Sequence, residues 1–258
     1  MRYIEIDRLL RKRSRWGDRK ELWKNKKLQD DFRAFFFNKC WYTEVILIGQ
    51  DPHIDHFRPK AEIQPFEQYK YNVPLKDSGY YWLKNEPRNY RLCCVYANRK
   101  TGDGGKGCYF PLSDDSAFLT EEGTETETPL LIDPCNRDDV VLVSFMGNQV
   151  VAASANPLDQ TRVDVSKKIY NLIDPYIMAE RAKTWNSVEQ ILASYQSGDI
   201  TRTYCVRQLS ELVSRDAQFS ACAIACVNSL APDDMKTSRS RSKKPLSCKC
   251  RHFVYGVY

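Results

Sequence analysis

The stretch DPHIDHFRPK, residues 51–60, decides how this chain is expected to fold. The whole sequence contains only three histidines, and two of them, His53 and His56, lie within these ten residues. The residue types alternate along HIDHF, and Pro59 ends the run because proline lacks the amide hydrogen that a strand ladder needs. We therefore expect a short strand that carries Asp55 and His56 near its end.

Three segments around this strand have readable patterns. TEVILIGQ (residues 43–50) is rich in β-branched residues and is bounded by glycine and proline, which predicts a further strand. NYRLCCVYANRK (residues 89–100) predicts the end of a strand followed by the start of a helix. VVLVSFMGNQVVAAS (residues 140–154) predicts a β-hairpin with Gly147 and Asn148 at the turn.

Helical patterns lie on both sides of this central part. Residues 1–38 carry scattered apolar positions among many lysines and arginines, and residues 161–227 predict two or three helices broken near Pro175 and Gly198. Six basic residues of the first segment form either a solvated face or one that contacts phosphate: Arg11, Lys12, Arg13, Arg15, Arg19 and Lys20. We divide the chain into an N-terminal basic helical segment, a central core, a C-terminal helical region and a basic tail, at residues 1–38, 39–155, 156–235 and 236–258.

The composition limits the class of protein. The 258 residues are 42% hydrophobic, which is enough for a core, and the formal net charge of +6 is too mild to establish nucleic-acid binding by itself. No signal peptide and no apolar stretch of about 18 residues is present, so we expect a soluble cytoplasmic protein without a membrane span. The ten cysteines are then expected as thiols, metal ligands or small buried residues rather than disulfides.

The DH pair and two later asparagines together resemble the HNH family of nucleases. In that family a ββα-metal finger carries a DH or HH pair, then an asparagine, and then a final histidine or asparagine on the helix. Asp55-His56, Asn89 and Asn98 match this order, and the interval of nine positions between the two asparagines fits the register of the family. The resemblance implies that residues 39–155 form an HNH nuclease core.

Longer phrases resemble one branch of the family. YYWLKNEPRNYRL, KGCYFPL and ETPLLIDPCNRDD are similar to PtuB-type HNH proteins, which are effectors of Septu and retron anti-phage defence systems. The likeness covers roughly residues 38–145. It implies an α+β fold, with the finger embedded in a mainly helical domain. It also implies a PtuA-like ATPase partner and, in retron versions, a reverse transcriptase with its RNA–DNA product.

The resemblance gives roles to individual residues. His56 is the expected general base, because a neutral imidazole can take a proton from water. Asp55 and Asn98 are the expected ligands of Mg²⁺ or Mn²⁺, which prefer oxygen donors, and Asn89 is expected to hydrogen-bond the loop that positions His56. His53 either assists or is a loop residue. The expected phosphate contacts are Arg58, Lys60, Arg99 and Lys100.

Strand geometry adds a constraint to these roles. Adjacent residues of a strand point to opposite faces, so Asp55 and His56 cannot both face one metal ion from a regular strand. The family ends the strand at this place, and Pro59 is consistent with such an ending. Asn98, for its part, either serves as a ligand or caps a turn.

Relatives usually bind a structural zinc ion with two CxxC pairs, which this chain keeps only in part. The matching positions are Cys40 with Thr43 and Cys94 with Ala97, so each pair lacks its second thiol. Either the zinc is absent and aromatic packing holds the finger, or spare thiols complete the site. The aromatic residues concerned are Trp41, Tyr42 and Tyr96, and the spare thiols are Cys93 and Cys108.

Three functions are therefore open. The first is a metal-dependent HNH endonuclease that acts in an anti-phage complex on DNA or on RNA such as tRNA. The second is a catalytically inactive subunit of such a complex that binds nucleic acid or a partner. The third is a cysteine-based redox or zinc protein of another class, which would hold about one zinc ion per chain.

Overall fold

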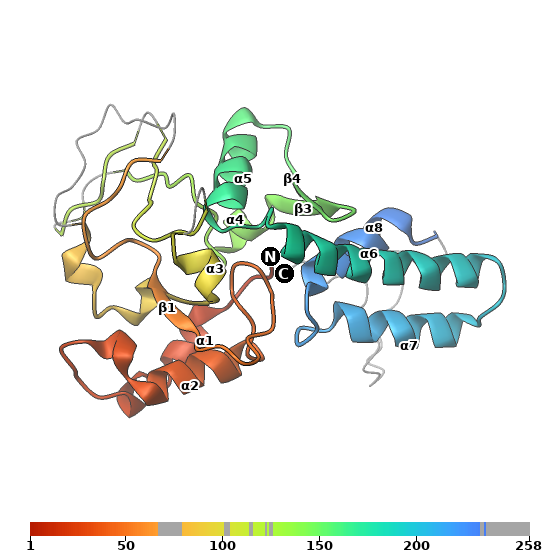
Figure 1. Cartoon of the computed structure of the whole chain (residues 1–258), viewed down its shortest axis with the longest axis horizontal. Coiled ribbons are helices and arrows are strands. Elements are labelled where there is room, and N and C mark those ends of the chain that lie inside the picture. Colours follow the sequence, from red (N-terminus) through yellow and green to blue (C-terminus); the bar gives the residue numbers. More distant parts are fainter. Residues whose placement is uncertain are drawn as a thin grey trace, which may run out of the picture.

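The computed structural model describes residues 1–66, 79–100, 104–113, 116–121, 123, 126–232 and 235, and the basic tail at 236–258 lies outside them. The chain is of mixed α+β class (Figure 1). Within the described ranges the α-helices are α1 (Ile6–Leu10), α2 (Lys26–Phe35), α3 (Val95–Asn98), α4 (Arg137–Val140), α5 (Pro157–Ile169), α6 (Pro175–Gln196), α7 (Arg202–Val213) and α8 (Ser220–Leu230). The 3₁₀ turns are η1 (Arg13–Arg15), η2 (Leu22–Lys24), η3 (Tyr81–Leu83) and η4 (Pro87–Asn89). The strands are β1 (His53–His56), β2 (Tyr90–Cys93), β3 (Val143–Met146) and β4 (Gln149–Ala152).

The N-terminal segment folds into short helices, as its sequence predicts. The side chain of Asn25 caps α2 by accepting a hydrogen bond from the amide of Leu28 at 3.1 Å. α2 buries Leu28 and Phe32, and the Phe32 ring stacks on Trp41 with ring centres 5.2 Å apart. The helix is thereby fixed against the central part of the chain.

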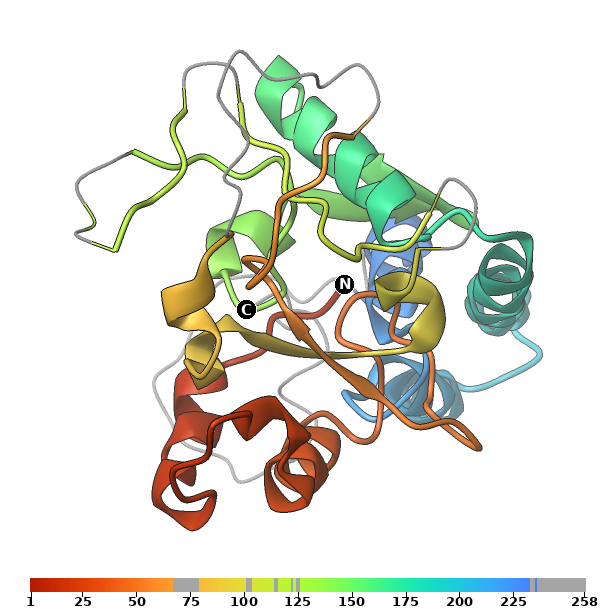
Figure 2. The same ribbon diagram turned by 60° about the vertical axis from the view of Figure 1, so that its left-hand side comes forward.

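β1 and β2 form an antiparallel pair that leads directly into α3. His53 lies opposite Cys93, and His56 lies opposite Tyr90. A single residue, Cys94, separates β2 from α3, and α3 contacts β1, as Figure 2 shows for these three elements. The strand at HIDH and the strand-to-helix transition in NYRLCCVYANRK are both confirmed.

The strand predicted at residues 43–50 is wrong. Within this segment Ile46 makes only an isolated bridge to Lys39. Glu44 adopts a left-handed conformation with φ of +64°, which a strand cannot contain. The reason is that the Glu44 carboxylate turns into the interior, where it accepts a hydrogen bond from Ser220 of α8 at 3.0 Å.

The C-terminal half contains the predicted hairpin and one more helix than expected. β3 and β4 pair antiparallel around a turn in which Gly147 has a φ of +60°. The predicted breaks near Pro175 and Gly198 are confirmed, but a further break after Val213 separates α7 from α8, so the helices number four rather than two or three.

Two hydrophobic clusters make up the core. The first includes buried residues from Met1 to Leu172, and the second includes those from Ile177 to Met235. Phe145 of β3 packs against both clusters, and in Figure 1 α6, α7 and α8 lie together on the right of the molecule. Among the described helices, none combines the length and apolar character that crossing a membrane requires.

Candidate active site around strand β1

The Asp55 carboxylate is buried and fully engaged on one face of β1. It is 4% exposed, and its Oδ2 accepts a hydrogen bond from the Tyr42 hydroxyl at 2.6 Å. Its Oδ1 accepts from the Lys106 ammonium at 3.1 Å, and Lys106, which is 0% exposed, also donates to the His56 carbonyl oxygen at 2.8 Å. Burial, with the charge of Asp55 second, raises the pKa of Tyr42 well above its ordinary value, so its hydroxyl stays a donor.

His56 lies on the opposite face of β1 in apolar surroundings. Its ring meets the edges of Trp23 and Tyr90, each with ring centres 5.0 Å apart. Its Nε2 lies 2.9 Å from the carbonyl oxygen of Lys84. A carbonyl oxygen only accepts, so Nε2 must carry the hydrogen, and Nδ1 is left with a lone pair.

The same surroundings keep His56 neutral. The residue is 6% exposed, and burial lowers the pKa of its imidazole to about 4 because the charged form would lose its water. The hydrogen bond to the Lys84 carbonyl opposes this shift, and the positive charge of Lys60 adds to it. At neutral pH His56 is therefore an uncharged imidazole in a fixed tautomer.

Asn89 hydrogen-bonds the backbone of the two residues that follow His56. Its Oδ1 accepts from the amide of Arg58 at 2.8 Å, and its Nδ2 donates to the carbonyl oxygen of Arg58 at 2.9 Å. Its own carbonyl accepts from the amide of Phe57 at 2.8 Å. The expected hydrogen bonds between Asn89 and the loop after His56 are present.

Asn98 and His53 form a separate pair. The Nδ2 of Asn98 lies 3.0 Å from the Nδ1 of His53, and both residues are half-buried. Asp55, His56 and Asn98 thus end in three different surroundings. Each oxygen of Asp55 accepts one hydrogen bond, and Asn98 turns its Nδ2 towards His53, so the two expected ligands face different partners. In the parts of the chain that the structure describes, no group of three or more His, Cys, Asp or Glu residues is close enough to hold a metal ion.

The expected phosphate contacts also differ in their surroundings. The Arg58 guanidinium forms an ion pair with Glu127 at 2.6 Å, so it is already engaged within the protein. The Lys60 ammonium lies 4.9 Å from the centre of the Trp23 ring, on the same side as His56. The two exposed residues at the end of α3 are Arg99 and Lys100.

The four positions of the two CxxC pairs meet, although only two carry thiols. The amide of Thr43 donates to the Cys40 sulfur at 3.4 Å, and the Thr43 hydroxyl lies 3.9 Å from the Cys94 sulfur. Burial raises the pKa of Cys40, but hydrogen bonds from Cys94 and Thr43 outweigh it and bring that pKa to about 7. The hydrogen bond to Cys40, with burial, raises the pKa of Cys94. Two thiols cannot supply the four ligands of a tetrahedral Cys₄ zinc site, so such a site does not fit here.

The spare thiol Cys93 does not complete this cluster. Its sulfur points to the His53 carbonyl oxygen at a distance of 3.6 Å. Burial raises its pKa well above the ordinary value, which keeps it a neutral thiol. The other spare thiol, Cys108, is partly exposed. Trp41 and Tyr42 are buried beside the cluster, whereas Tyr96 is 56% exposed.

Sequence reasoning missed the partners of the DH pair. Lys106 belongs to the phrase KGCYFPL, but nothing in its position along the chain indicates that its ammonium is buried against Asp55. Lys84 acts through its backbone carbonyl, which carries no side-chain signal at all. The only available clue was local: Lys106 lies between two glycines just before the apolar run CYFPL, and a lysine that is buried needs an acidic partner.

Comparison with models of known protein families and with curated proteins finds no match to this chain.

Proposed function

We propose that this protein is an HNH-type nuclease, a hydrolase of phosphodiester bonds in nucleic acid. The order β1–β2–α3, with the DH pair on β1, Asn89 just before β2 and Asn98 at the end of α3, supports this proposal. The single observation that carries it is the state of His56. Its Nε2–H is held by a backbone carbonyl, and its Nδ1 keeps a lone pair at neutral pH.

In this proposal each residue has a defined task. The Nδ1 of His56 takes a proton from the water that attacks phosphorus, and Lys84 fixes the orientation of the ring through Nε2. Asn89 hydrogen-bonds the amide and the carbonyl of Arg58. These bonds fix the loop after His56 and help to hold the imidazole in position. Lys60, beside Trp23, is the expected phosphate contact whose charge acts on the ring.

The proposal is tested by nicking assays on DNA and on total RNA, in buffers with and without Mg²⁺ or Mn²⁺. His56→Gln is expected to reduce the cleavage rate by about 10² to 10⁴-fold, the usual contribution of a general base. His53→Gln, on the opposite face of the same strand, is the matched variant and is expected to lose much less. Equal cleavage by the wild type and His56→Gln would remove His56 as the base.

One observation favours a second function, that of a catalytically inactive subunit. Lys106 occupies the carboxylate of Asp55, the residue that the resemblance assigns to a cation. If this arrangement persists in the working complex, the chain binds nucleic acid or a partner without cleaving. Undiminished nucleic-acid binding with no cleavage under any divalent cation, also in the presence of an ATPase partner, would favour this alternative.

The partners are part of the proposal and rest on the resemblance alone. They are a PtuA-like ATPase and, in a retron setting, a reverse transcriptase with its RNA–DNA product. Purification of the chain together with the products of its neighbouring genes tests them. Recovery of a stable complex with an ATPase is the expected result, and recovery of the chain alone would contradict it.

A further inference from the structure

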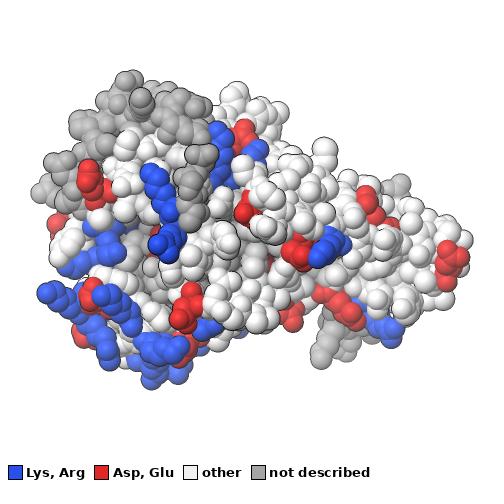
Figure 3. Space-filling view, viewed as in Figure 1, with Lys and Arg blue, Asp and Glu red and all other residues white. Residues whose placement is uncertain are grey.

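The positive charge of the described part of the chain is concentrated at its N-terminal end. Residues 1–35 contain twelve lysines and arginines against six acidic residues, so this short segment alone carries a charge of +6. Figure 3 shows lysine and arginine side chains gathered on the lower left of the molecule, over α1 and α2. A local concentration of this kind attracts polyanions even where the whole chain is only mildly basic.

A groove of about 540 Å³ lies within this basic region. Four cationic side chains line it, Arg8, Lys12, Arg137 and Arg215, against the single acid Glu5. They come from α1, the turn after it, α4 and the loop between α7 and α8, so the fold brings them together from distant parts of the sequence. Lys12 is paired with Asp31 at 3.1 Å, but the other three cations still outnumber Glu5, so the groove keeps a positive excess.

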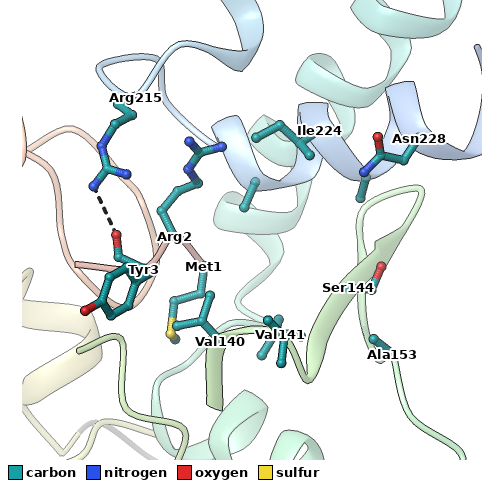
Figure 4. A pocket seen from close by; sticks show the side chains of 13 residues that line it. Met1, Arg2, Tyr3, Val140, Val141, Ser144, Ala153, Arg215, Ile224 and Asn228 are labelled. Carbon is teal, nitrogen blue, oxygen red and sulfur yellow. Dashed lines mark hydrogen bonds between the residues drawn. The ribbon is translucent and has the colours of Figure 1, made fainter. Parts of the chain in front are cut away.

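The cation at one wall of the groove is held in a fixed position. Arg215 donates from Nη2 to the carbonyl oxygen of Tyr3 at 3.0 Å, and Figure 4 shows this contact. Tyr3 and Arg215 also line a smaller pocket of about 170 Å³, whose lining includes Val140, Ile224 and Arg2. Arg8, Lys12 and Arg137 line the groove and not the smaller pocket, so the groove gathers more of the cations.

Aromatic rings line the same groove. Tyr3, Phe35 and Phe37 contribute to its walls, and Arg137 lies 4.8 Å from the centre of the Tyr3 ring. Phe37 is 48% exposed and has a φ of +53°, a left-handed conformation that a phenylalanine rarely adopts. Residues held in such strained conformations cluster at active sites and ligand-binding sites.

We infer that this groove binds a single strand of nucleic acid, with its cations on the phosphates and the Phe37 ring stacked on a base. Single-strand sites combine a positive groove with exposed aromatic side chains, and every base offers a face for stacking. An acidic polypeptide would use the charges but would not require the exposed ring. The volume is within the range of pockets that hold small organic ligands, so a nucleotide-sized group has room.

This site goes beyond the proposed nuclease and does not depend on cleavage. Trp23, which touches His56, precedes α2, and Phe37 follows its other end. A helix of ten residues is about 15 Å long, so the groove is remote from the His56 imidazole. It would hold a strand whether or not the chain cleaves it.

The test is fluorescence anisotropy of a labelled 20-nucleotide single strand with the full-length protein, in EDTA and over a series of salt concentrations. Arg8→Ala combined with Arg137→Ala is expected to lower the slope of log affinity against log salt by about 1.4, since each phosphate contact contributes about 0.7. Phe37→Ala is expected to weaken binding about tenfold with an unchanged slope, because it removes stacking and no charge.

Matched variants elsewhere on the surface provide the control. Arg202→Ala removes an exposed arginine at the start of α7, and Tyr176→Ala removes a ring that is 80% exposed. Both are expected to leave affinity and salt slope unchanged. The inference is overturned if the groove variants behave like these controls. It is also overturned if polyglutamate competes as well as the oligonucleotide and Phe37→Ala has no effect, which would indicate an acidic protein ligand instead.

Discussion

The two faces of β1 differ sharply, although the residues that define them are neighbours in sequence. On one face, the buried Asp55 carboxylate is paired with the Lys106 ammonium and accepts a hydrogen bond from Tyr42. On the other, His56 is kept uncharged between two aromatic rings. A buried acid and a buried base are therefore stabilised in opposite ways one residue apart. Successive residues of a strand point to opposite faces, so the Asp55 carboxylate and the His56 imidazole are kept apart.

The largest expected effect comes from removing the cation on the Asp55 face. Lys106→Met leaves a carboxylate with 4% exposure without its ion pair, which costs about 3 to 5 kcal/mol of unfolding free energy. Urea unfolding monitored by circular dichroism measures the loss. The double variant Asp55→Asn with Lys106→Met is the control and is expected to recover part of it. A loss below about 1 kcal/mol in the single variant would mean that Asp55 does not depend on a buried ion pair with Lys106.

The His56 face is tested by pH. The unfolded chain binds a proton on this histidine below its ordinary pKa of about 6.5, whereas the folded chain resists protonation down to about 4. The contribution of the neutral imidazole is therefore fully present above pH 6.5 and is lost as the pH falls from 6.5 towards 4. At most it is about 3 kcal/mol, taking about 1.4 kcal/mol per pH unit.

Urea unfolding between pH 4.5 and 7.5 isolates this contribution when the wild type is compared with His56→Gln. The wild type is expected to lose more stability than the variant as the pH falls, since carboxylates titrate in both. Parallel pH curves for the two proteins would contradict the neutral, buried state of His56.

A smaller loss of stability is expected from Asn89, which holds the loop that follows His56. Asn89→Ala removes the partners of the Arg58 amide and carbonyl, which costs about 1 to 3 kcal/mol. Because the loop after His56 loosens, cleavage is expected to fall as well. Thermal unfolding and nicking rates measured on the same preparation test both results. Unchanged values would show that Asn89 does not position this loop.

The smallest effect on stability is expected from the half-buried pair on the Asp55 face. Asn98→Ala removes one hydrogen bond to His53 near the surface, worth about 0.5 to 1.5 kcal/mol. If cleavage nevertheless falls by 100-fold or more, Asn98 has the catalytic role that the resemblance implies. If cleavage is unchanged, its role is confined to holding His53.

Local patterns predicted much of the fold near the site. Alternation along HIDHF, the proline at position 59 and the change of pattern at NYRLCC were sufficient for β1, β2 and the start of α3. The same alternation indicated that Asp55 and His56 could not face one point, and they do lie on opposite faces. These predictions succeed because backbone geometry over a few residues determines them.

Contacts across long stretches of sequence were not predictable. Lys106 is 51 positions from Asp55, and Ser220 is 176 positions from Glu44. The segment 43–50 has β-branched residues that favour a strand, but Glu44 is buried there among long-range partners, the Met1 amino group and Ser220, which local preference does not include. The meeting of Cys40 with Cys94 was indicated by spacing in relatives, whereas the lowered pKa of Cys40 depends on hydrogen bonds that only coordinates give.

The histidine ring itself provides the most direct test of the difference between the two faces. Nitrogen-15 NMR of histidine-labelled protein, titrated from pH 8 to the lowest pH at which it stays folded, reports both the tautomer and the pKa, and His56→Gln assigns the signal. We expect His56 to remain neutral, with its hydrogen on Nε2, until the pH approaches about 4. Protonation near pH 6.5, or a hydrogen on Nδ1, would contradict the account.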